Sequence, residues 1–123
     1  MKIAFDYQIF SQQSYGGISR YYNSLVLNLS KLDHDISIFA GIHRNKYISS
    51  LPKELVKGYE LSKYPPKSAK LFLLANHYLT KYQIQQWKPD LIHETYYSFF
   101  KPTINNVPRI VTAYDMVHEL FPK

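Results

Sequence analysis

Apolar and polar positions along this chain follow two periods, one typical of strands and one typical of helices. Short apolar runs at residues 2–6, 35–40, 90–93 and 109–113 predict strands. After the first run, apolar side chains return every three or four positions and predict a helix over residues 17–32. The side chains on that face are Ile18, Tyr21, Tyr22, Leu25, Leu29 and Leu32.

The middle of the chain has a weaker pattern, because prolines interrupt residues 42–67. A short helix over residues 53–57 and a minor strand over 59–61 are expected there. Ser68 is a suitable N-cap, so a second long helix is predicted from that residue to about Trp87. Between Tyr96 and Asn106 the pattern allows either a loop or a short helix.

This order of elements predicts an α/β fold, a Rossmann-like, doubly wound and mostly parallel sheet. The first strand is expected inside the sheet, and Gly41 is expected to close the strand over residues 35–40. The chain has 123 residues, enough for one core. Its pattern stops after a strand, where a nucleotide-binding domain would continue with a helix. Residues 1–123 are therefore expected to form an incomplete N-terminal domain of a larger protein.

Composition excludes several classes of protein. Apolar residues make up 46% of the chain, which is typical of a folded domain and not of a disordered one. The chain has no cysteine, so a disulfide framework and a thiolate metal site are excluded. The start of the chain does not resemble a signal peptide, and no apolar run reaches about 18 residues. A cytoplasmic location is expected, with peripheral attachment to the inner face of the membrane as an open alternative.

The positive charge is concentrated in the middle of the chain. Residues 41–89 hold nine basic and two acidic side chains, a net charge of +7, whereas the whole chain carries +6. Three interpretations stay open: a solvated lysine-rich face, a nucleic-acid contact and an anionic membrane surface. No nucleic-acid-binding motif accompanies the lysines, which disfavours the second. The third is favoured by aromatic and apolar residues among the lysines of the second long helix. Much of the apolar face of that helix is nonetheless expected to pack on the sheet.

The loop after the first strand is the strongest candidate for a binding site. The strand ends at Asp6, nine residues follow, and Gly16 and Gly17 open the next helix. Ligands of α/β sheets bind at this end of the first strand, and helix N-terminal N–H groups favour anions. Glycines allow a close approach to the main chain. A plain loop-to-helix turn is the alternative. Arg20, one turn into the helix, is a candidate phosphate contact.

Three segments together resemble the N-terminal domain of retaining GT-B glycosyltransferases of the large family-4 group. They are GGISRYY at residues 16–22, PDLIHE at 89–94 and PRIVTAYDMVHELFP at 108–122. The resemblance covers nearly all of this chain but about a third of a family member. It implies two Rossmann-like domains facing a cleft, with the sugar nucleotide bound mainly by a C-terminal domain that this sequence does not contain.

The resemblance also implies a function. The chain would be the acceptor-side part of an enzyme that moves a sugar from a nucleotide-sugar donor to a glycan or lipid-linked acceptor, in the synthesis of a bacterial surface polysaccharide. Neither a metal nor another cofactor is implied, and nucleic acid is not expected as a partner. Without the donor-binding domain, the 123-residue chain is expected to be inactive.

The resemblance assigns the site residues by position. Asp115 is the catalytic candidate, and Gly16, Gly17, Arg20, Glu94, Tyr96, Tyr114 and His118 are substrate-binding candidates. The family usually has His-Asp where this chain has Tyr114-Asp115, which puts a histidine-dependent role there in doubt. Asp6 and His93 also lie at strand ends, where a structural role is the simpler interpretation. Gly17→Val is expected to impair turnover more than Arg20→Ala, partly because valine disfavours a positive φ.

Two other functions are considered. A non-catalytic relic, or a membrane-docking or binding module, would keep the fold without transferring a sugar. A nicotinamide-dependent oxidoreductase needs a tight Gly-x-Gly-x-x-Gly turn, and nine residues separate Asp6 from a bare Gly16-Gly17 pair. The oxidoreductase is therefore disfavoured.

Overall fold

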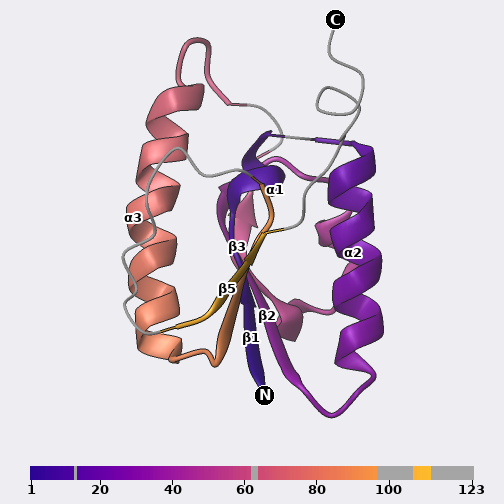
Figure 1. Ribbon diagram of the computed structural model, residues 1–123. Helices are drawn as coiled ribbons and strands as arrows, with labels where there is room; N and C mark the ends of the chain where they lie inside the picture. The colour runs from indigo at the N-terminus through magenta and orange to yellow at the C-terminus, as the bar shows by residue number, and fades with distance from the viewer. Residues whose placement is uncertain (13, 62–63, 97–106, 112–123) are drawn as a thin grey trace, which may run out of the picture.

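The protein forms a three-layer α/β structure around a parallel sheet (Figure 1). The computed structural model describes residues 1–12, 14–61, 64–96 and 107–111. The strands are β1 (Lys2–Phe5), β2 (Asp35–His43), β3 (Val56–Glu60), β4 (Leu91–Glu94) and β5 (Arg109–Val111). The helices are α1 (Gln8–Gln12), α2 (Gly17–Ser30) and α3 (Ala69–Trp87), with 3₁₀ turns at Ile48–Ser50 and Lys53–Leu55.

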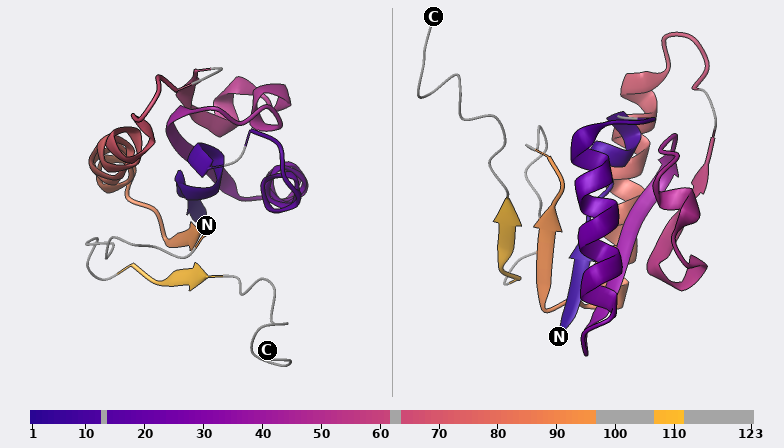
Figure 2. Two further views of the ribbon diagram at one scale, coloured as in Figure 1. Left: turned by 90° about the horizontal axis from the view of Figure 1, so that it is seen from above. Right: turned by 90° about the vertical axis from the view of Figure 1, so that its right-hand side faces the viewer.

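The five strands lie in the order β3-β2-β1-β4-β5, and every pair is parallel. β1 lies at the centre, which confirms the prediction that the first strand is inside the sheet. The right-hand view of Figure 2 shows β4 and β5 on one side of β1, with β2 and β3 on the other. α2 and α3 cover opposite faces of the sheet (Figure 1). This arrangement is that of a Rossmann-like fold.

Each face of the sheet has its own core. Toward α2, twelve buried residues from β1, α1, α2, β2 and the two 3₁₀ turns form the larger cluster, with Phe5, Phe10 and Tyr22 at its centre. Toward α3, the cluster has only four buried residues: Ala4, Phe39, Ile84 and Ile92. The alternation of side chains along β1 and β2 distributes them between the two faces.

Several predicted boundaries change in the structure. The strand expected over 35–40 runs to His43, because Gly41 forms a bulge with positive φ (61°) and does not end the strand. A side chain at Gly41 would come within 2.5 Å of Asn76 Oδ1, so this close approach needs glycine. The 53–57 helix is a 3₁₀ turn, and the minor strand begins earlier, at Val56.

The helix predicted over 17–32 ends at Ser30, and its buried stripe is narrower than expected. Ser19, Tyr22 and Val26 are buried, whereas Tyr21 and Leu32 are exposed. The loop predicted after Asp6 contains a short helix, α1, whose Ile9 and Phe10 are fully buried. Five residues are too few to show a helical period in the sequence.

α3 lies on the sheet with its polar residues inward. Its buried side chains are Asn76, Thr80 and Ile84. Leu71, Leu74, Tyr78, Leu79 and Tyr82 are exposed, Leu71 by 67% and Tyr78 by 63%. Asn76 accounts for this orientation, since its side chain bonds Ile42 N (2.8 Å), Ile42 O (2.9 Å) and Ser11 Oγ (2.8 Å). The prediction that much of the apolar face packs on the sheet is therefore wrong.

Among the helices that the structure describes, α3 included, none combines the length and the apolar character needed to cross a bilayer.

Candidate functional site

The carboxyl ends of β1 and β4 define the candidate site. From β1 the chain builds outward through β2 and β3, then returns to the other side of β1 with β4. In open α/β sheets, ligands bind at such a reversal of strand order, beyond the carboxyl ends of the strands. Asp6 follows β1, and Glu94 and Thr95 lie at the end of β4, so acidic and hydroxyl groups meet at this point.

The Asp6 carboxylate joins the two strand ends. Its Oδ1 accepts hydrogen bonds from Thr95 N (2.8 Å) and Thr95 Oγ1 (2.6 Å), and its Oδ2 accepts one from Gln8 Nε2 (2.6 Å). Thr95 Oγ1 accepts in turn from Ile9 N (3.1 Å). Burial raises the pKa of Asp6, and the bonds from Gln8 and Thr95 oppose that rise. The carboxylate is therefore a structural tie between β1, α1 and β4, as the simpler interpretation expected.

Glu94 is the second carboxylate at this point. It is buried at the end of β4, and its Oε1 accepts a hydrogen bond from Arg109 of β5 (3.0 Å). Burial raises the pKa of Glu94, the neighbouring charge of Asp6 raises it further, and Arg109 opposes both. The second oxygen, Oε2, has no hydrogen-bond donor among the described residues. It is available to accept a hydrogen bond from a ligand hydroxyl.

His93 is a structural residue under the site. Its ring stacks on Phe5 at 5.1 Å between centroids and meets the edge of Tyr22 at 5.2 Å. Tyr22 Oη lies 3.3 Å from His93 Nε2. Burial lowers the pKa of His93, so the neutral imidazole is favoured. The ring links β1, β4 and α2 from within the core.

The N-terminus of α2 borders the same end of the sheet. Gly16 is the N-cap, with an extended φ of 177°, and its carbonyl accepts from Arg20 N (3.0 Å) and Ser19 Oγ (3.1 Å). Gly17 is exposed, and a Cβ placed on it would meet no atom within 4 Å. Among the described glycines, only Gly41 has a φ in the left-handed region. The expected strain at Gly17 is therefore absent, and what remains is open space beside its main chain.

Arg20 and Tyr96 differ in their surroundings. The Arg20 side chain is exposed, and no described carboxylate forms an ion pair with it. Tyr96 is partly buried and packs against the larger core cluster. Glu94, Tyr96 and the N-terminus of α2 thus surround the carboxyl ends of β1 and β4. Tyr114, Asp115 and His118 lie outside the described residues, as do positions 112 and 113 of the predicted last strand.

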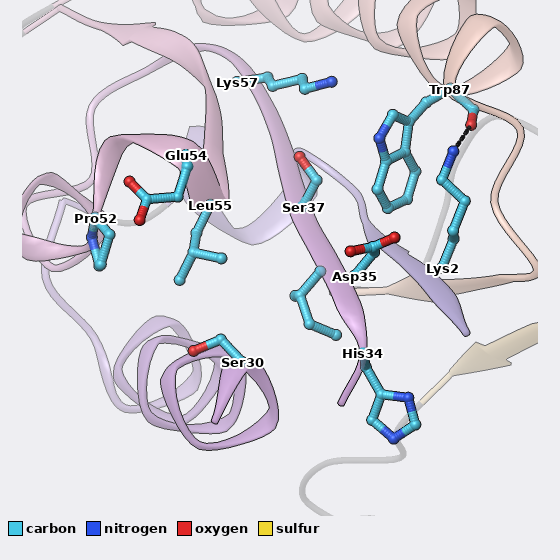
Figure 3. A pocket seen from close by; sticks show the side chains of 11 residues that line it. Lys2, Ser30, His34, Asp35, Ser37, Pro52, Glu54, Leu55, Lys57 and Trp87 are labelled. Carbon is cyan, nitrogen blue, oxygen red and sulfur yellow. Dashed lines mark hydrogen bonds between the residues drawn. The ribbon is translucent and has the colours of Figure 1, made fainter. Parts of the chain in front are cut away.

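A cavity of about 630 Å³ lies at the opposite, amino-terminal edge of the sheet (Figure 3). Figure 3 shows Asp35 and Glu54 among its acidic groups, with Lys2 and Lys57 as basic groups. The Lys2 ammonium donates to the Trp87 carbonyl (2.7 Å). Asp6 and Glu94 lie at the carboxyl ends of their strands, so this cavity is at the other end of the sheet. None of the predicted site residues that the structure describes lines it.

In the described ranges, no three His, Asp or Glu side chains come together as a possible metal site. Comparison with protein-family models, with curated proteins and with solved structures finds no match to this chain.

Sequence reasoning missed two groups of the site, Thr95 and Arg109. Thr95 directly follows Glu94, and a hydroxyl residue immediately after a strand end was the available signal. Arg109 was assigned to a strand, but its pairing with Glu94 depends on β4 and β5 being neighbours. That neighbour relationship is a property of strand order, which the sequence pattern does not contain.

Proposed function

We propose that this chain is the acceptor-side part of a glycosyltransferase that uses a nucleotide-sugar donor and a glycan or lipid-linked acceptor in bacterial surface polysaccharide synthesis. The supporting observation is the joint position of Glu94 and Gly17 around the ends of β1 and β4. Glu94 offers a carboxylate oxygen to which no described residue donates, and Gly17 offers open main chain at a helix N-terminus.

The Glu94 carboxylate suits the hydroxyls of a sugar, and the N-terminus of α2 suits the diphosphate of a nucleotide sugar. A carboxylate oxygen accepts hydrogen bonds from sugar hydroxyls, and Arg109 holds Glu94 in place for that role. The N–H groups that begin α2 favour the negative charge that develops on a leaving diphosphate. Arg20 is one turn further along α2 and adds a mobile positive charge. Asp115 is the catalytic residue in this proposal, and Tyr114 and His118 are assigned to substrate binding.

Sugar transfer is the direct test. We expect none from residues 1–123 alone, because both substrates must be held together for reaction. The same residues joined to a donor-binding domain, sought in the reading frame after the Lys123 codon, are expected to transfer sugar. In that protein, Glu94→Gln should lower kcat/KM by about tenfold, the effect of one charge-assisted hydrogen bond. The matched control is Glu54→Gln, which makes the same chemical change at an exposed glutamate of a 3₁₀ turn and should leave kcat/KM unchanged.

Asp115→Asn, compared with Asp33→Asn at an exposed position, tests the catalytic assignment in the same assay. Each variant is first checked for a wild-type free energy of unfolding. Equal turnover of Glu94→Gln, Asp115→Asn and wild type would show that the active site is elsewhere. A reading frame without a second Rossmann pattern would instead favour a module that transfers nothing.

One observation favours a second candidate, a module that docks on an anionic membrane. The exposed face of α3 carries Leu71, Leu74, Tyr78 and Tyr82. From Leu61 to Pro89 the chain has five lysines and no acidic residue. Apolar and aromatic side chains with flanking lysines are the pattern of a helix that lies in the interface of an anionic bilayer. Such docking is also compatible with an enzyme that acts on a lipid-linked acceptor.

A further inference from the structure

A second cavity, of about 320 Å³, lies at the carboxyl end of β2. It is enclosed by the end of α1, by Arg44 just after β2, by Tyr64, and by the first turns of α3 through Lys70 and Leu73. Two of its lining residues are basic and none is acidic. A small cavity with this charge attracts anions.

The Arg44 guanidinium is fixed in this cavity. Its Nε donates to Ser11 O (3.1 Å) and its Nη2 to Gln12 O (2.7 Å), so α1 holds one edge of the group. The guanidinium also lies over the Tyr64 ring, 5.5 Å from the centroid. Carbonyl acceptors leave its charge uncompensated, and no described carboxylate pairs with it. For the other three of its five N–H groups, no acceptor is found among the described residues.

Tyr64 makes the support rigid. Its hydroxyl donates to Ile42 O (2.6 Å), and its ring stacks on Phe72 of α3, with centroids 4.5 Å apart and planes 12° apart. Burial raises the pKa of Tyr64, so the hydroxyl stays protonated and adds no negative charge. The arginine is therefore held in one orientation before any ligand arrives, which reduces the cost of binding.

Lys70 supplies the second charge. It lies in the first turn of α3, is exposed, and forms no ion pair with a described carboxylate. By contrast, Lys46, close to Arg44 in the sequence, is neutralised by Glu60 at 3.0 Å. The Ser68 hydroxyl donates to Pro65 O and does not cap α3, so the positive end of the helix dipole adds to the potential of the two side chains.

We propose that Arg44 and Lys70 bind a phosphate group, as a phosphomonoester or a diphosphate, in this cavity. A planar guanidinium fork matches two phosphate oxygens, and the exposed Lys70 ammonium lines the same cavity as a second positive charge. Neither Glu94 nor Gly17 lines this cavity, so this site goes beyond the glycosyltransferase proposal. Phosphate binding in this cavity can be measured without any sugar transfer. Its failure would therefore not contradict the glycosyltransferase proposal, and its success would not support it.

Pyrophosphate titrated into residues 1–123, followed by calorimetry and by amide shifts in NMR spectra, tests the site. We expect saturable binding, with the shifts concentrated at Ser11, Arg44 and Lys70. Arg44→Gln should weaken binding by about tenfold or more, as the loss of a charge-assisted contact. Lys70→Gln should weaken it by about threefold, as expected for an exposed charge. Lys53→Gln removes the same charge at an exposed position on a 3₁₀ turn and should change nothing.

Arg44→Gln also removes the bonds from Arg44 to α1, so it could weaken binding by disturbing the fold. Lys70→Glu is therefore tested beside it, because Lys70 is exposed and, among the described residues, no hydrogen bond joins its side chain to α1. Binding that is not saturable, or that Lys53→Gln weakens as much as Lys70→Gln does, would overturn the proposal. The same holds if Arg44→Gln and Lys70→Glu both leave binding unchanged.

Vesicles distinguish the source of the phosphate. Phosphatidylcholine vesicles containing phosphatidic acid present a phosphomonoester, and those containing phosphatidylglycerol present the diester. A preference for phosphatidic acid that Arg44→Gln abolishes identifies a lipid headgroup as the ligand. Pyrophosphate binding without that preference identifies a soluble phosphate compound.

Discussion

Thr95 donates both its main-chain N–H and its hydroxyl to one carboxylate oxygen of Asp6, at 2.8 and 2.6 Å. These two bonds connect residues 89 positions apart and fix the ends of β1 and β4 against each other. The geometry of the candidate site depends on them, because Glu94 is the residue before Thr95. A change at Thr95 is therefore expected to act on stability and on the site together.

Thr95→Val should lower the free energy of unfolding by about 2 kcal/mol, since it removes a buried charge-assisted hydrogen bond while keeping the side-chain shape. Urea unfolding measures the difference. Thr80→Val is the matched control, a buried threonine on α3 whose hydroxyl only donates to Asn76 O within the helix (2.6 Å). Its cost should be below about 1 kcal/mol. Equal costs for the two variants would show that the Asp6–Thr95 bonds contribute nothing special.

Two glycines should respond in opposite ways to alanine. Gly17→Ala should leave the free energy of unfolding unchanged or raise it by up to about 1 kcal/mol, because its Cβ meets open space and glycine is a poor helix former. Gly41→Ala should lower it by at least about 1 kcal/mol, because a positive φ is combined with a contact to Asn76. Thermal or urea unfolding of both variants decides, and a marked loss at Gly17 would contradict the described geometry.

His93 should make the fold sensitive to mild acid. Its pKa is lowered below 6.5 by burial, so as the pH falls the unfolded chain takes up the proton before the folded one. This contribution to stability is complete above about pH 6.5 and is lost as the pH falls through the folded-state pKa. The free energy of unfolding should therefore fall less between about pH 7 and about pH 5 in His93→Gln than in wild type.

His34→Gln, which removes an exposed histidine, is the control variant for that measurement. Asp6 and Glu94 have raised pKa values, so their effect on the pH dependence of the free energy of unfolding has the opposite sign. Both carboxyl groups are present in variant and wild type, so the difference between the two proteins does not contain this effect. A wild-type slope in His93→Gln would mean that the ring accepts its proton as readily in the folded protein as in the unfolded one.

The exposed face of α3 should bind anionic vesicles in a salt-dependent way. Lys67→Gln combined with Lys81→Gln should weaken binding by about 2 kcal/mol, roughly 30-fold, at about 1 kcal/mol for each lysine near the surface. Tyr78→Ser should weaken it through the loss of an interfacial aromatic side chain. Co-sedimentation with phosphatidylglycerol vesicles at low and high salt gives the measurement.

The control pair Lys31→Gln and Lys53→Gln makes the same change in net charge at exposed positions outside α3. It should leave vesicle binding close to wild type. If both pairs weaken binding equally, the attraction comes from net charge alone and not from α3. No binding at low salt would leave the lysines as a solvated face.

The sequence pattern located β1, β2 and β4 because each contains a short apolar run, and these runs are buried in the sheet. It placed β1 inside the sheet and opened α2 at Gly17 correctly. It failed for α3, whose apolar residues suggested the buried face. One asparagine, Asn76, makes three hydrogen bonds to β2 and α1 and decides the orientation instead. Hydrogen bonds made by one polar residue produce no periodic pattern in the sequence, so they could not be predicted from it.

The candidate site was predictable in part. Strand ends pointed to Asp6, His93 and Glu94, because residues just after parallel strands gather at one edge. The pairing of Glu94 with Arg109 and the anchoring of Arg44 by Ser11 and Gln12 were not predictable. Each joins residues that are distant in sequence. The first depends on the order of the strands, and the second depends on α1, which is too short to show a helical period in the sequence.

The inward-facing Asn76 and Thr80 change how α3 is held. A helix attached mainly by apolar burial separates from a sheet only when the core opens, whereas α3 buries little apolar surface and depends on a few directed bonds. Its amides should consequently exchange with solvent through a local opening of lower free energy than global unfolding. We therefore expect the α3 layer to open as a separate cooperative unit while β1, β2 and α2 stay folded.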